Sequence, residues 1–309
     1  MKPLSVISGS VAFVPLLYKI RHVGVATFNV GEGEIMRRRE LIIALGIAMA
    51  WPIAANGQPD VRALRSQILL MQAAGIADKL AQFIKEMQNQ VGWTTQLPTG
   101  TYLPTGGYSI QQRRFDALRL LRQAPAVTEL SLLDAQGKEF YKASRLAMDV
   151  VGSGTDYSKE AKFTETVAKK IYYGPVYLRR ESEPYMTLGL AGTPSDAGVS
   201  VVELNLSLMW DIVQQTKIGD RGVAYVVNAE GRVIAHPDFG VRKSLRDLSS
   251  LAQVEEARTP RASTTRALTG SARIARDMND QKVVAAYARV AGPGWLVFVE
   301  LPIEEWTKY

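Results

Sequence analysis

The sequence predicts an α+β fold in which one long N-terminal helix is followed by two antiparallel sheets. Apolar residues between Asp60 and Gly92 recur at three- and four-residue steps, which is the spacing of an amphipathic helix. Two similar hairpin patterns follow at 127–146 and 222–238, each with short apolar runs around a glycine-containing turn. Groups of strands joined by hairpins and separated by helices are typical of α+β proteins with antiparallel sheets.

The predicted helix at 60–92 is unusually long. Pro59 and Asp60 are suitable helix starters, and Gly92 can end the run. About 32 residues at 1.5 Å each span roughly 48 Å, enough to pass two stacked domains. Two roles remain open, an amphipathic core helix or a dimer-forming one. Its apolar positions are Val61, Leu64, Ile68, Met71, Leu80, Phe83, Met87 and Val91.

The first sheet is predicted between residues 93 and 205. Prolines and glycines make 93–109 a loop, and the spacing of Phe115, Leu118 and Leu121 predicts a basic helix at 111–123. A loop at 152–157 and a short helix at 159–170 separate the first hairpin from the remaining strands. Those strands are predicted at 171–179, 184–191 and 198–205.

The second sheet is predicted after a bridging helix at 206–216. The hairpin at 222–238 begins it, and a helix is expected at 245–257. Residues 259–280 are polar and poorly periodic, with room for one strand. Strands at 281–290 and 294–301 then close the sheet around the turn Gly292-Pro293-Gly294.

The sequence of Gly222–Asp238, GVAYVVNAEGRVIAHPD, resembles that of the central hairpin of Cache domains. These are PAS-like extracytoplasmic sensor modules of bacterial receptors, in which G-x-x-Y-(V/L)-(V/L)-(D/N)-x-x-G-x-(V/L)-(V/I/L)-(A/S)-H-P-(D/N) recurs. The element order over 60–303, and the closing run from Gly294 to Pro302, also resemble the double Cache fold. The resemblance implies a small-molecule sensor that is not an enzyme.

The same resemblance divides the chain. It implies a spine helix at 58–92, a membrane-distal Cache subdomain at 93–205, a membrane-proximal one at 206–303 and a tail at 304–309. No output region follows in this sequence, so we expect a receptor sensor that lacks its output domain. The alternative is a stand-alone periplasmic binding protein or an inactive receptor remnant.

Residues 1–57 read as a leader. Arg37, Arg38 and Arg39 precede an uncharged run from Leu41 to Pro59, the order of charges and apolar residues in an export signal. Within 36–57 the segment is either a cleaved signal peptide or an uncleaved signal anchor. We expect Met36 to be the working start and residues 1–35 to be spurious. Both alternatives place the protein in the periplasm or on the outer face of the inner membrane, with membrane contact only through an anchor.

Composition excludes several functions. The net charge is +7, but residues 1–57 hold six Lys/Arg against three Asp/Glu, so the charge on the rest is too dilute for nucleic-acid binding. The chain has no cysteine and only two histidines, which argues against a metal site. His236 precedes a proline at a strand end and is interpreted as structural. No nucleophile elbow or phosphate loop occurs, so we expect no catalytic residues and no cofactor.

Tyrosines cluster on the predicted strands 171–179 and 184–191. Strand alternation predicts that Tyr173, Tyr177 and Arg179 share one face, with Tyr172 and Val176 on the other. Such residues suit a small-molecule pocket, and the cations favour an anionic or hydroxylated ligand. The alternative is that these tyrosines pack between sheet and helix. The candidate ligand-binding residues are Tyr157, Lys162, Tyr173, Tyr177, Arg179, Tyr185 and Thr187.

The family supplies a further comparison for these positions. Many amino-acid-binding double Cache domains carry an arginine followed by Trp-Tyr on the helix facing the first sheet, and later a tyrosine and an aspartate. Here Glu160 stands at the arginine, Lys162-Phe163 at Trp-Tyr, Tyr185 at the tyrosine and Thr187 near the aspartate. The departure at the arginine and aspartate argues against the family's usual grip on an α-amino acid. Lys162 or Arg179 would instead receive an organic acid.

Overall fold

The computed structural model describes residues 61–95, 110–180, 183–193, 197–259 and 272–308. All of these belong to one unit, Pro59–Tyr309, which separates from Met1–Gln58. The predicted leader, most of the loop at 93–109 and much of the segment at 259–280 therefore lie outside the described residues. Within the described ranges, no helix is both long enough and apolar enough to cross a bilayer.

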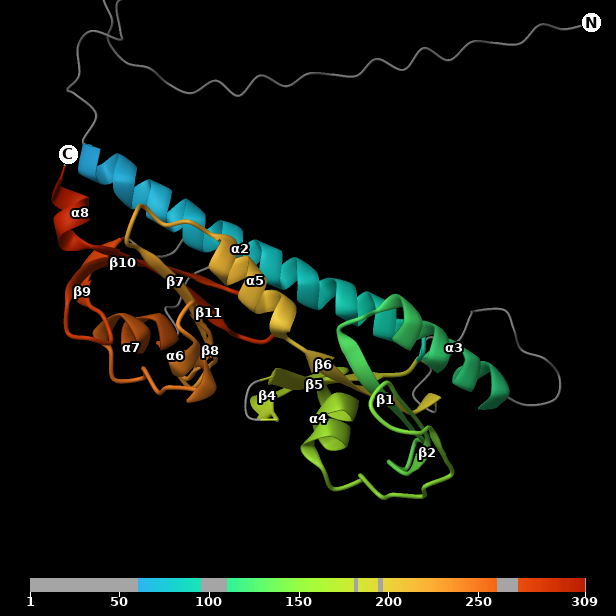
Figure 1. Ribbon diagram of the computed structural model, residues 1–309. Coiled ribbons are helices and arrows are strands. Elements are labelled where there is room, and N and C mark those ends of the chain that lie inside the picture. Colours follow the sequence, from blue (N-terminus) through green and yellow to red (C-terminus); the bar gives the residue numbers. More distant parts are fainter. Residues whose placement is uncertain (1–60, 96–109, 181–182, 194–196, 260–271, 309) are drawn as a thin grey trace, which may run out of the picture. The chain divides into compact units, whose positions relative to one another are not determined.

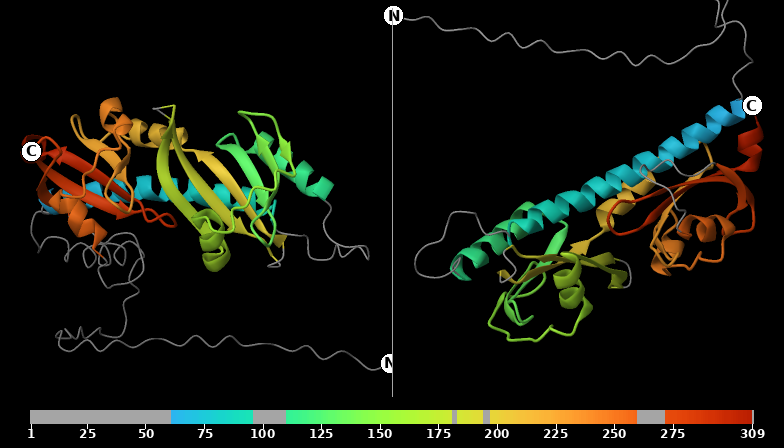
Figure 2. Two further views of the ribbon diagram at one scale, coloured as in Figure 1. Left: turned by 90° about the horizontal axis from the view of Figure 1, so that it is seen from below. Right: turned by 180° about the vertical axis from the view of Figure 1, so that it is seen from behind.

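Helix α2 (Val61–Gly92) confirms the predicted long helix. It runs beside both sheets (Figures 1 and 2). It contacts β5 (Glu183–Ala191) and β6 (Val199–Asn205) of the first sheet and β10 (Lys282–Arg289) and β11 (Leu296–Pro302) of the second. Burying one stripe of an amphipathic helix against two sheets joins them through a shared core. The side chains that it buries are Leu69, Ala73, Ile76, Ala77, Leu80, Ile84, Met87 and Val91.

The first sheet has six strands in the order β3-β2-β1-β6-β5-β4, and every neighbouring pair is antiparallel. Helix α3 (Ile110–Gln123) packs on β1 and β2, and helix α4 (Ala161–Lys169) lies over β4, β5 and β6. The strands are β1 (Val127–Leu133), β2 (Glu139–Ser144), β3 (Val150–Val151), β4 (Ile171–Arg179), β5 (Glu183–Ala191) and β6 (Val199–Asn205).

The two faces of this sheet have different partners. Met186, Leu188 and Val202 are buried in the core that includes α2. The alternate positions face α4. There Gly189 allows close packing, because a Cβ at this position would lie 2.2 Å from the Thr166 hydroxyl oxygen. Helix α4 is short and lies over β4, β5 and β6, so it covers part of this side of the sheet, which is named the α4 face.

The second sheet has five antiparallel strands in the order β8-β7-β11-β10-β9. Helix α5 (Ser207–Gln215) joins the sheets and packs against α2. Val297 and Val299 share the α2 core, whereas Leu296 and Phe298 lie in a separate cluster with Val254 of α7. The strands are β7 (Val223–Val227), β8 (Val233–Ala235), β9 (Arg273–Arg276), β10 (Lys282–Arg289) and β11 (Leu296–Pro302).

The helix predicted at 245–257 is wrong over its first half. Leu245 has a φ of 44°, which no right-handed helix accepts, and helix α7 covers only Ala252–Arg258. A helix that the sequence analysis missed, α6 (Phe239–Lys243), comes earlier. Asp238 begins it by accepting the Val241 backbone N–H at 3.1 Å, as an N-cap residue does.

Two more short elements were not predicted. Strand β3 lies in the region between the first hairpin and the predicted loop at 152–157. Helix α8 (Ile303–Thr307) occupies most of the predicted tail. Its Trp306 is buried, and the Trp306 carbonyl accepts a 2.5 Å hydrogen bond from Nη1 of Arg65 on α2. The last helix is thereby fastened to the first turns of α2 (Figure 1).

Candidate functional site

A β-bulge in β4 decides which tyrosines face α4. Tyr173 pairs with Leu188 but Val176 pairs with Met186, so β4 holds one more residue than β5 across this interval. The extra residue falls at Gly174-Pro175, where proline removes a ladder N–H and glycine tolerates the bend. An inserted residue reverses the alternation beyond it.

The predicted face of Tyr173 is therefore wrong. Tyr173 lies on the α2 face with Val176, next to the core, and its hydroxyl accepts a hydrogen bond from Nε2 of Gln88 on α2. Tyr172, predicted beside Val176, instead lies on the α4 face opposite Gly189. The alternative interpretation, packing between sheet and helix, describes Tyr173 well.

Four other predicted residues do meet on the α4 face. Tyr177 pairs directly with Tyr185, and their ring centroids lie 6.1 Å apart. The guanidinium carbon of Arg179 lies 4.6 Å from the centroid of the Tyr185 ring, within cation–π range. Thr187 follows on the same face of β5. Tyr185 is fully buried, whereas Tyr177, Arg179 and Thr187 are half-buried.

A carboxylate that the sequence analysis missed completes this group. Glu203 on β6 pairs with Thr187 in the ladder and accepts its hydroxyl at 2.8 Å. The other oxygen of Glu203 accepts the Tyr177 hydroxyl at 2.5 Å. Burial, and then this bond, raise the pKa of Tyr177, so its hydroxyl stays protonated as a donor. Glu203 thus supplies an acid beside the position where the family resemblance expected an aspartate.

A second missed carboxylate, Glu129 on β1, lies between two cations. Its oxygens are 2.9 Å from Arg179 Nη1 and 2.9 Å from Lys142 Nζ, and its side chain is only 15% exposed. Burial acts to raise the pKa of Glu129, but the bonds and charges of Lys142 and Arg179 outweigh it. The pKa therefore lies below its usual value, and Glu129 is ionised at neutral pH.

Tyr157 and Lys162 lie at the side of this group. The Lys162 ammonium is 3.6 Å from the centroid of the Tyr157 ring and 3.2 Å from a Glu160 oxygen. Tyr157 packs against a small cluster that includes Phe163 at the start of α4. Burial and the nearby Glu139 raise the pKa of Tyr157, and the charge of Lys142 opposes them. Tyr157 therefore lies close enough to Lys142, the partner of Glu129, to interact with its charge.

The assembled face brings charged groups and hydroxyls together. Glu129 and Glu203 balance Lys142 and Arg179, and hydroxyls of Tyr177, Tyr185 and Thr187 lie among them. Asn205 adds an amide that donates to the Tyr185 hydroxyl at 3.3 Å. Within the described ranges, no three His, Asp or Glu side chains gather closely enough to hold a metal ion. The face is suited to a small polar molecule with both donors and acceptors.

His236 lies away from this face, in the second sheet. It is buried, and its Nδ1 accepts the backbone N–H of Asp238 at 2.9 Å. Its ring centroid is 6.0 Å from that of Tyr225. These contacts agree with the structural role predicted from its place before Pro237.

Two of the missed residues had a signal in the sequence. Glu203 and Glu129 are single charges inside otherwise apolar strands, VSVVELN and VTELSLL. A lone charge in such a strand faces the partly covered side of a sheet more often than the core. Which strand lies next to which could not be deduced, so their meeting with Thr187 and Arg179 was not foreseen.

Comparison with known proteins identifies the fold. A family model described as Cache domain matches residues 58–308. The extracellular domain of the putative histidine kinase mmHK1S-Z2 has a TM-score of 0.60 at 13% identity, covering 79% of this chain and 99% of that one. The comparison with curated proteins returned no match.

Two chemoreceptor domains are similar as well. The ligand-binding domain of Campylobacter jejuni Tlp3, in complex with L-norvaline, has a TM-score of 0.60 at 12% identity over 82% of this chain and 98% of that one. The ligand-binding domain of the Pseudomonas aeruginosa PAO1 amino acid chemoreceptor PctC, in complex with GABA, has a TM-score of 0.55 at 17% identity over 78% and 100%. With its long helix, its two antiparallel sheets and a family match over residues 58–308, this chain belongs to the Cache domain family of sensor domains.

Proposed function

We propose that the chain is the extracytoplasmic ligand-binding sensor of a bacterial signal-transduction receptor. In this proposal the first sheet is the membrane-distal subdomain and binds the ligand on its α4 face. The observation that carries the proposal is the convergence of Tyr177 and Arg179 of β4 with Glu203 of β6 on one half-buried surface. Converging polar groups with aromatic walls are characteristic of small-molecule sites.

The chemistry of this face favours a ligand with two different ends. Arg179 suits a carboxylate or hydroxyl, which retains the expected preference for an anionic or hydroxylated molecule. Glu203 is bonded only by neutral hydroxyls among the described residues, so it suits a ligand ammonium or other donor. Norvaline and GABA, the molecules in the Tlp3 and PctC complexes, carry both kinds of group. We therefore propose a small zwitterion or hydroxylated acid, held differently from the family's usual arginine–aspartate arrangement.

A thermal-shift screen of the full chain tests the site. The panel holds amino acids, GABA, small carboxylates and polyols, because a ligand at 100 times its dissociation constant stabilises a protein by about 2.7 kcal/mol. Arg179→Ala and Glu203→Gln are expected to abolish the shift of the responding compound. Arg221→Ala, which removes an exposed arginine paired with Glu304, is the matched control. A full response in Arg179→Ala and Glu203→Gln would exclude this face as the site.

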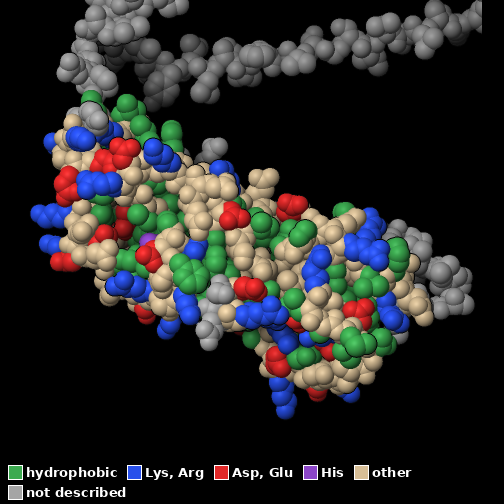
Figure 3. All heavy atoms as spheres, in the orientation of Figure 1, with side chains coloured by type: hydrophobic (Ala, Val, Ile, Leu, Met, Phe, Trp, Pro, Cys, Tyr) green, Lys and Arg blue, Asp and Glu red, His purple; other side chains and the backbone are tan. Residues whose placement is uncertain are grey.

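We also propose that two copies associate through the first turns of α2. Val61, Leu64, Ile68 and Met71 are 50%, 52%, 47% and 65% exposed. Their steps of three, four and three residues are those of a coiled-coil seam, whose natural partner is a second identical seam. Hydrophobic side chains are visible along this end of α2 in Figure 3.

Light scattering over a range of concentrations tests this association. The wild-type chain is expected to form dimers that Ile68→Glu dissociates. Ala63→Glu places the same charge on an exposed position away from the seam and is expected to leave the dimer intact. A wild-type chain that stays monomeric at every concentration refutes the proposal.

A further inference from the structure

A single carboxyl group lies inside the core of the second sheet. Glu300 on β11 is 6% exposed and shares its face with Phe298 and Leu296, toward α7. Across the sheet its neighbours are Val223 on β7 and Ala285 on β10, neither of which can accept or donate through its side chain. Burying a carboxyl among apolar residues disfavours its ionised form.

Two donors hold one oxygen of this carboxyl. The Tyr225 hydroxyl donates to Oε1 of Glu300 at 2.6 Å, and Nε2 of Gln253 donates to the same atom at 3.0 Å. Gln253 also donates to the Arg276 carbonyl at 2.8 Å. Glu300 therefore links β7, β11, α7 and β9. Within the described ranges Oε2 accepts no hydrogen bond, so it is the oxygen that can carry a proton.

The charges around Glu300 do not favour its ionisation. The charged group acting on it is Asp277, another carboxylate, in the turn after β9. Tyr225 on β7 is neutral, since burial and Glu300 raise its pKa well above the usual value. His236 lies beyond the Tyr225 ring, and burial lowers its pKa. Burial and Asp277 together outweigh the two donors and raise the pKa of Glu300 to about 7.

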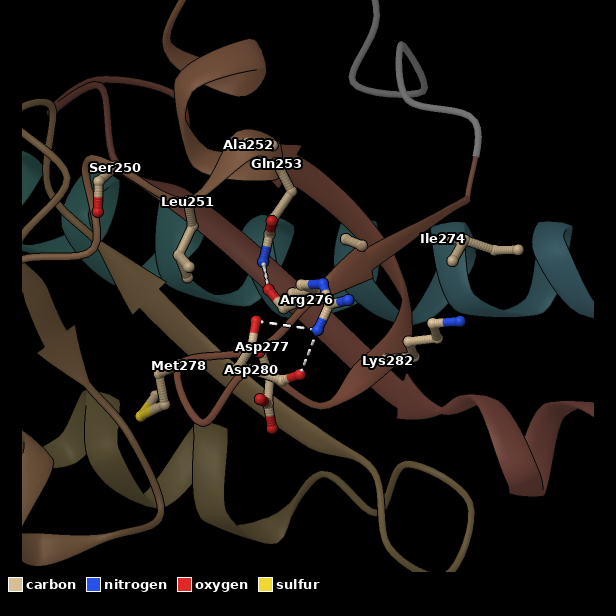
Figure 4. Close-up of a pocket in the computed structure, with 11 residues that line it drawn as sticks. Ser250, Leu251, Ala252, Gln253, Ile274, Arg276, Asp277, Met278, Asp280 and Lys282 are labelled. Carbon is tan, nitrogen blue, oxygen red and sulfur yellow. Dashed lines mark hydrogen bonds and ion pairs between the residues drawn. The ribbon is translucent and has the colours of Figure 1, made fainter.

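One of the two donors to Glu300 also lines a hollow in the second sheet. A hollow of about 570 Å³ lies between α7, β9 and the turn that follows β9, and Gln253 forms part of its wall. Figure 4 shows the Gln253 amide reaching from α7 to the Arg276 main chain, while the Arg276 guanidinium is held by Asp280. Gln253, which donates to Glu300, thus also lines this hollow.

We propose that Glu300, Tyr225 and Gln253 form a proton-binding site through which the second sheet senses pH. The ligand is the proton itself, and the site is separate from the α4 face of the first sheet. When Oε2 releases its proton to solvent, an uncompensated charge faces Asp277 inside the core. The two donors bind the ionised carboxylate more strongly, but its burial and the repulsion by Asp277 destabilise this part of the second sheet, only two residues before Pro302 leads into α8.

The sign of the effect follows from linkage. Between about pH 4.5 and 7 the folded chain keeps the Glu300 proton that the unfolded chain has lost, so stability falls as pH rises through this window. His236 acts in the opposite direction. Because burial lowers the pKa of His236 in the folded state, His236 lowers the stability of the fold as pH falls below the usual pKa of a histidine.

Carboxyl-carbon NMR of the full chain, labelled with ¹³C at glutamate, tests the site directly. One resonance is expected to titrate with a midpoint near 7 and to disappear in Glu300→Gln. Glu255→Gln, the same change at an exposed position of α7, is expected to leave that resonance in place. A Glu300 resonance that titrates near the usual value of 4.5 overturns the proposal.

Two further measurements keep the test decisive if Glu300→Gln does not fold. Tyr225→Phe removes a donor to the carboxylate, so the midpoint is expected to move to higher pH; an unchanged midpoint counts against the site. The melting temperature is expected to fall between pH 5 and 8 in Glu255→Gln as in the wild type. None of these readouts needs a ligand, so failure of the thermal-shift screen and failure of this proposal are distinguishable.

Discussion

The two sheets turn very different faces away from α2. On the first, the α4 face holds half-buried tyrosines, an arginine and two carboxylates beneath a helix seated on only part of the sheet. On the second, Tyr225 stacks on Phe298 with centroids 5.2 Å apart, and Tyr287 lies 5.8 Å from Phe298. Aromatic rings therefore pack against one another on the second face, whereas polar side chains meet on the first. Sheets with similar strand arrangements thus carry faces of different polarity, because their side chains differ in size and type.

The carboxylates on the two faces also differ in their partners. On the first sheet Glu129 is paired with two cations and Glu203 with two hydroxyls, so both serve as acceptors on an accessible surface. On the second sheet Glu300 is buried, and no cation among the described residues pairs with it. The first sheet therefore presents carboxylates that are paired with cations and hydroxyls, and the second holds an acid whose charge its surroundings oppose.

The largest loss of stability is expected from a substitution among the aromatic rings of the second sheet. Phe298→Ala removes a fully buried ring and is expected to cost about 3–5 kcal/mol of the free energy of unfolding. Tyr177→Ala on the half-buried first face is expected to cost about 1–2 kcal/mol. Urea unfolding measures both. Equal costs would mean that the first face is as well packed as the second.

The next effect is the pH dependence of stability, which should have opposite signs on the two faces. The raised pKa of Glu300 predicts a loss of at most about 3 kcal/mol as pH rises from about 4.5 to above 7. The lowered pKa of Glu129 predicts stability that is present above its usual value of 4.5 and is lost as pH falls through the lowered one.

Chemical denaturation from pH 3 to 8 separates these contributions. Glu300→Gln is expected to flatten the neutral limb, and Glu129→Gln the acidic limb. If each variant flattened the limb assigned to the other, the electrostatic contrast between the faces would be wrong.

A smaller loss of stability is expected where helix α4 packs on β5 of the first sheet. Gly189→Ala places a Cβ 2.2 Å from the Thr166 hydroxyl oxygen, so α4 must shift from β5 at a cost of about 1–3 kcal/mol. Gly75→Ala is the matched control. Its Cβ meets nothing within 4 Å on the exposed side of α2, and it is expected to stabilise by about 0.5–1 kcal/mol. Thermal unfolding compares the two, and a stabilising Gly189→Ala would show that α4 does not pack closely on β5.

The smallest effect tests which face Tyr173 occupies. Tyr173→Phe removes only the hydrogen bond from Gln88, so we expect a loss of about 0.5–1.5 kcal/mol and an unchanged ligand response. Tyr177→Phe removes the donor to Glu203 and is expected to weaken the ligand response. Ligand-induced shifts in melting temperature measure the difference. A Tyr173→Phe variant that loses the response as Tyr177→Phe does would place Tyr173 at the site after all.

The fold could be predicted from the sequence because its strongest signals are periodic and local. The periodic apolar residues of 60–92 predict a helix, and the sequence of 222–238 predicts a hairpin. The structure confirms both elements. The helix at 245–257 failed over its first half because Leu245 has a positive φ and Asp247 pairs with Arg232, and no sequence period reveals either feature.

The candidate site was less predictable because it depends on pairing. One extra residue in the bulge reversed Tyr172 and Tyr173 while leaving Tyr177 and Arg179 as predicted. Glu129 and Glu203 come from β1 and β6, which neighbour each other in the sheet although about 70 residues separate them along the chain. Residue types on one strand can be foreseen, but the partners across the sheet require the register.

The bond between Arg65 and the Trp306 carbonyl has a mechanical consequence. It ties the first turns of α2 to the helix that follows β11, so the described chain enters and leaves its fold at one joint. Movement of either sheet along α2 would therefore act on the contact between α8 and α2, where these two parts of the described chain meet.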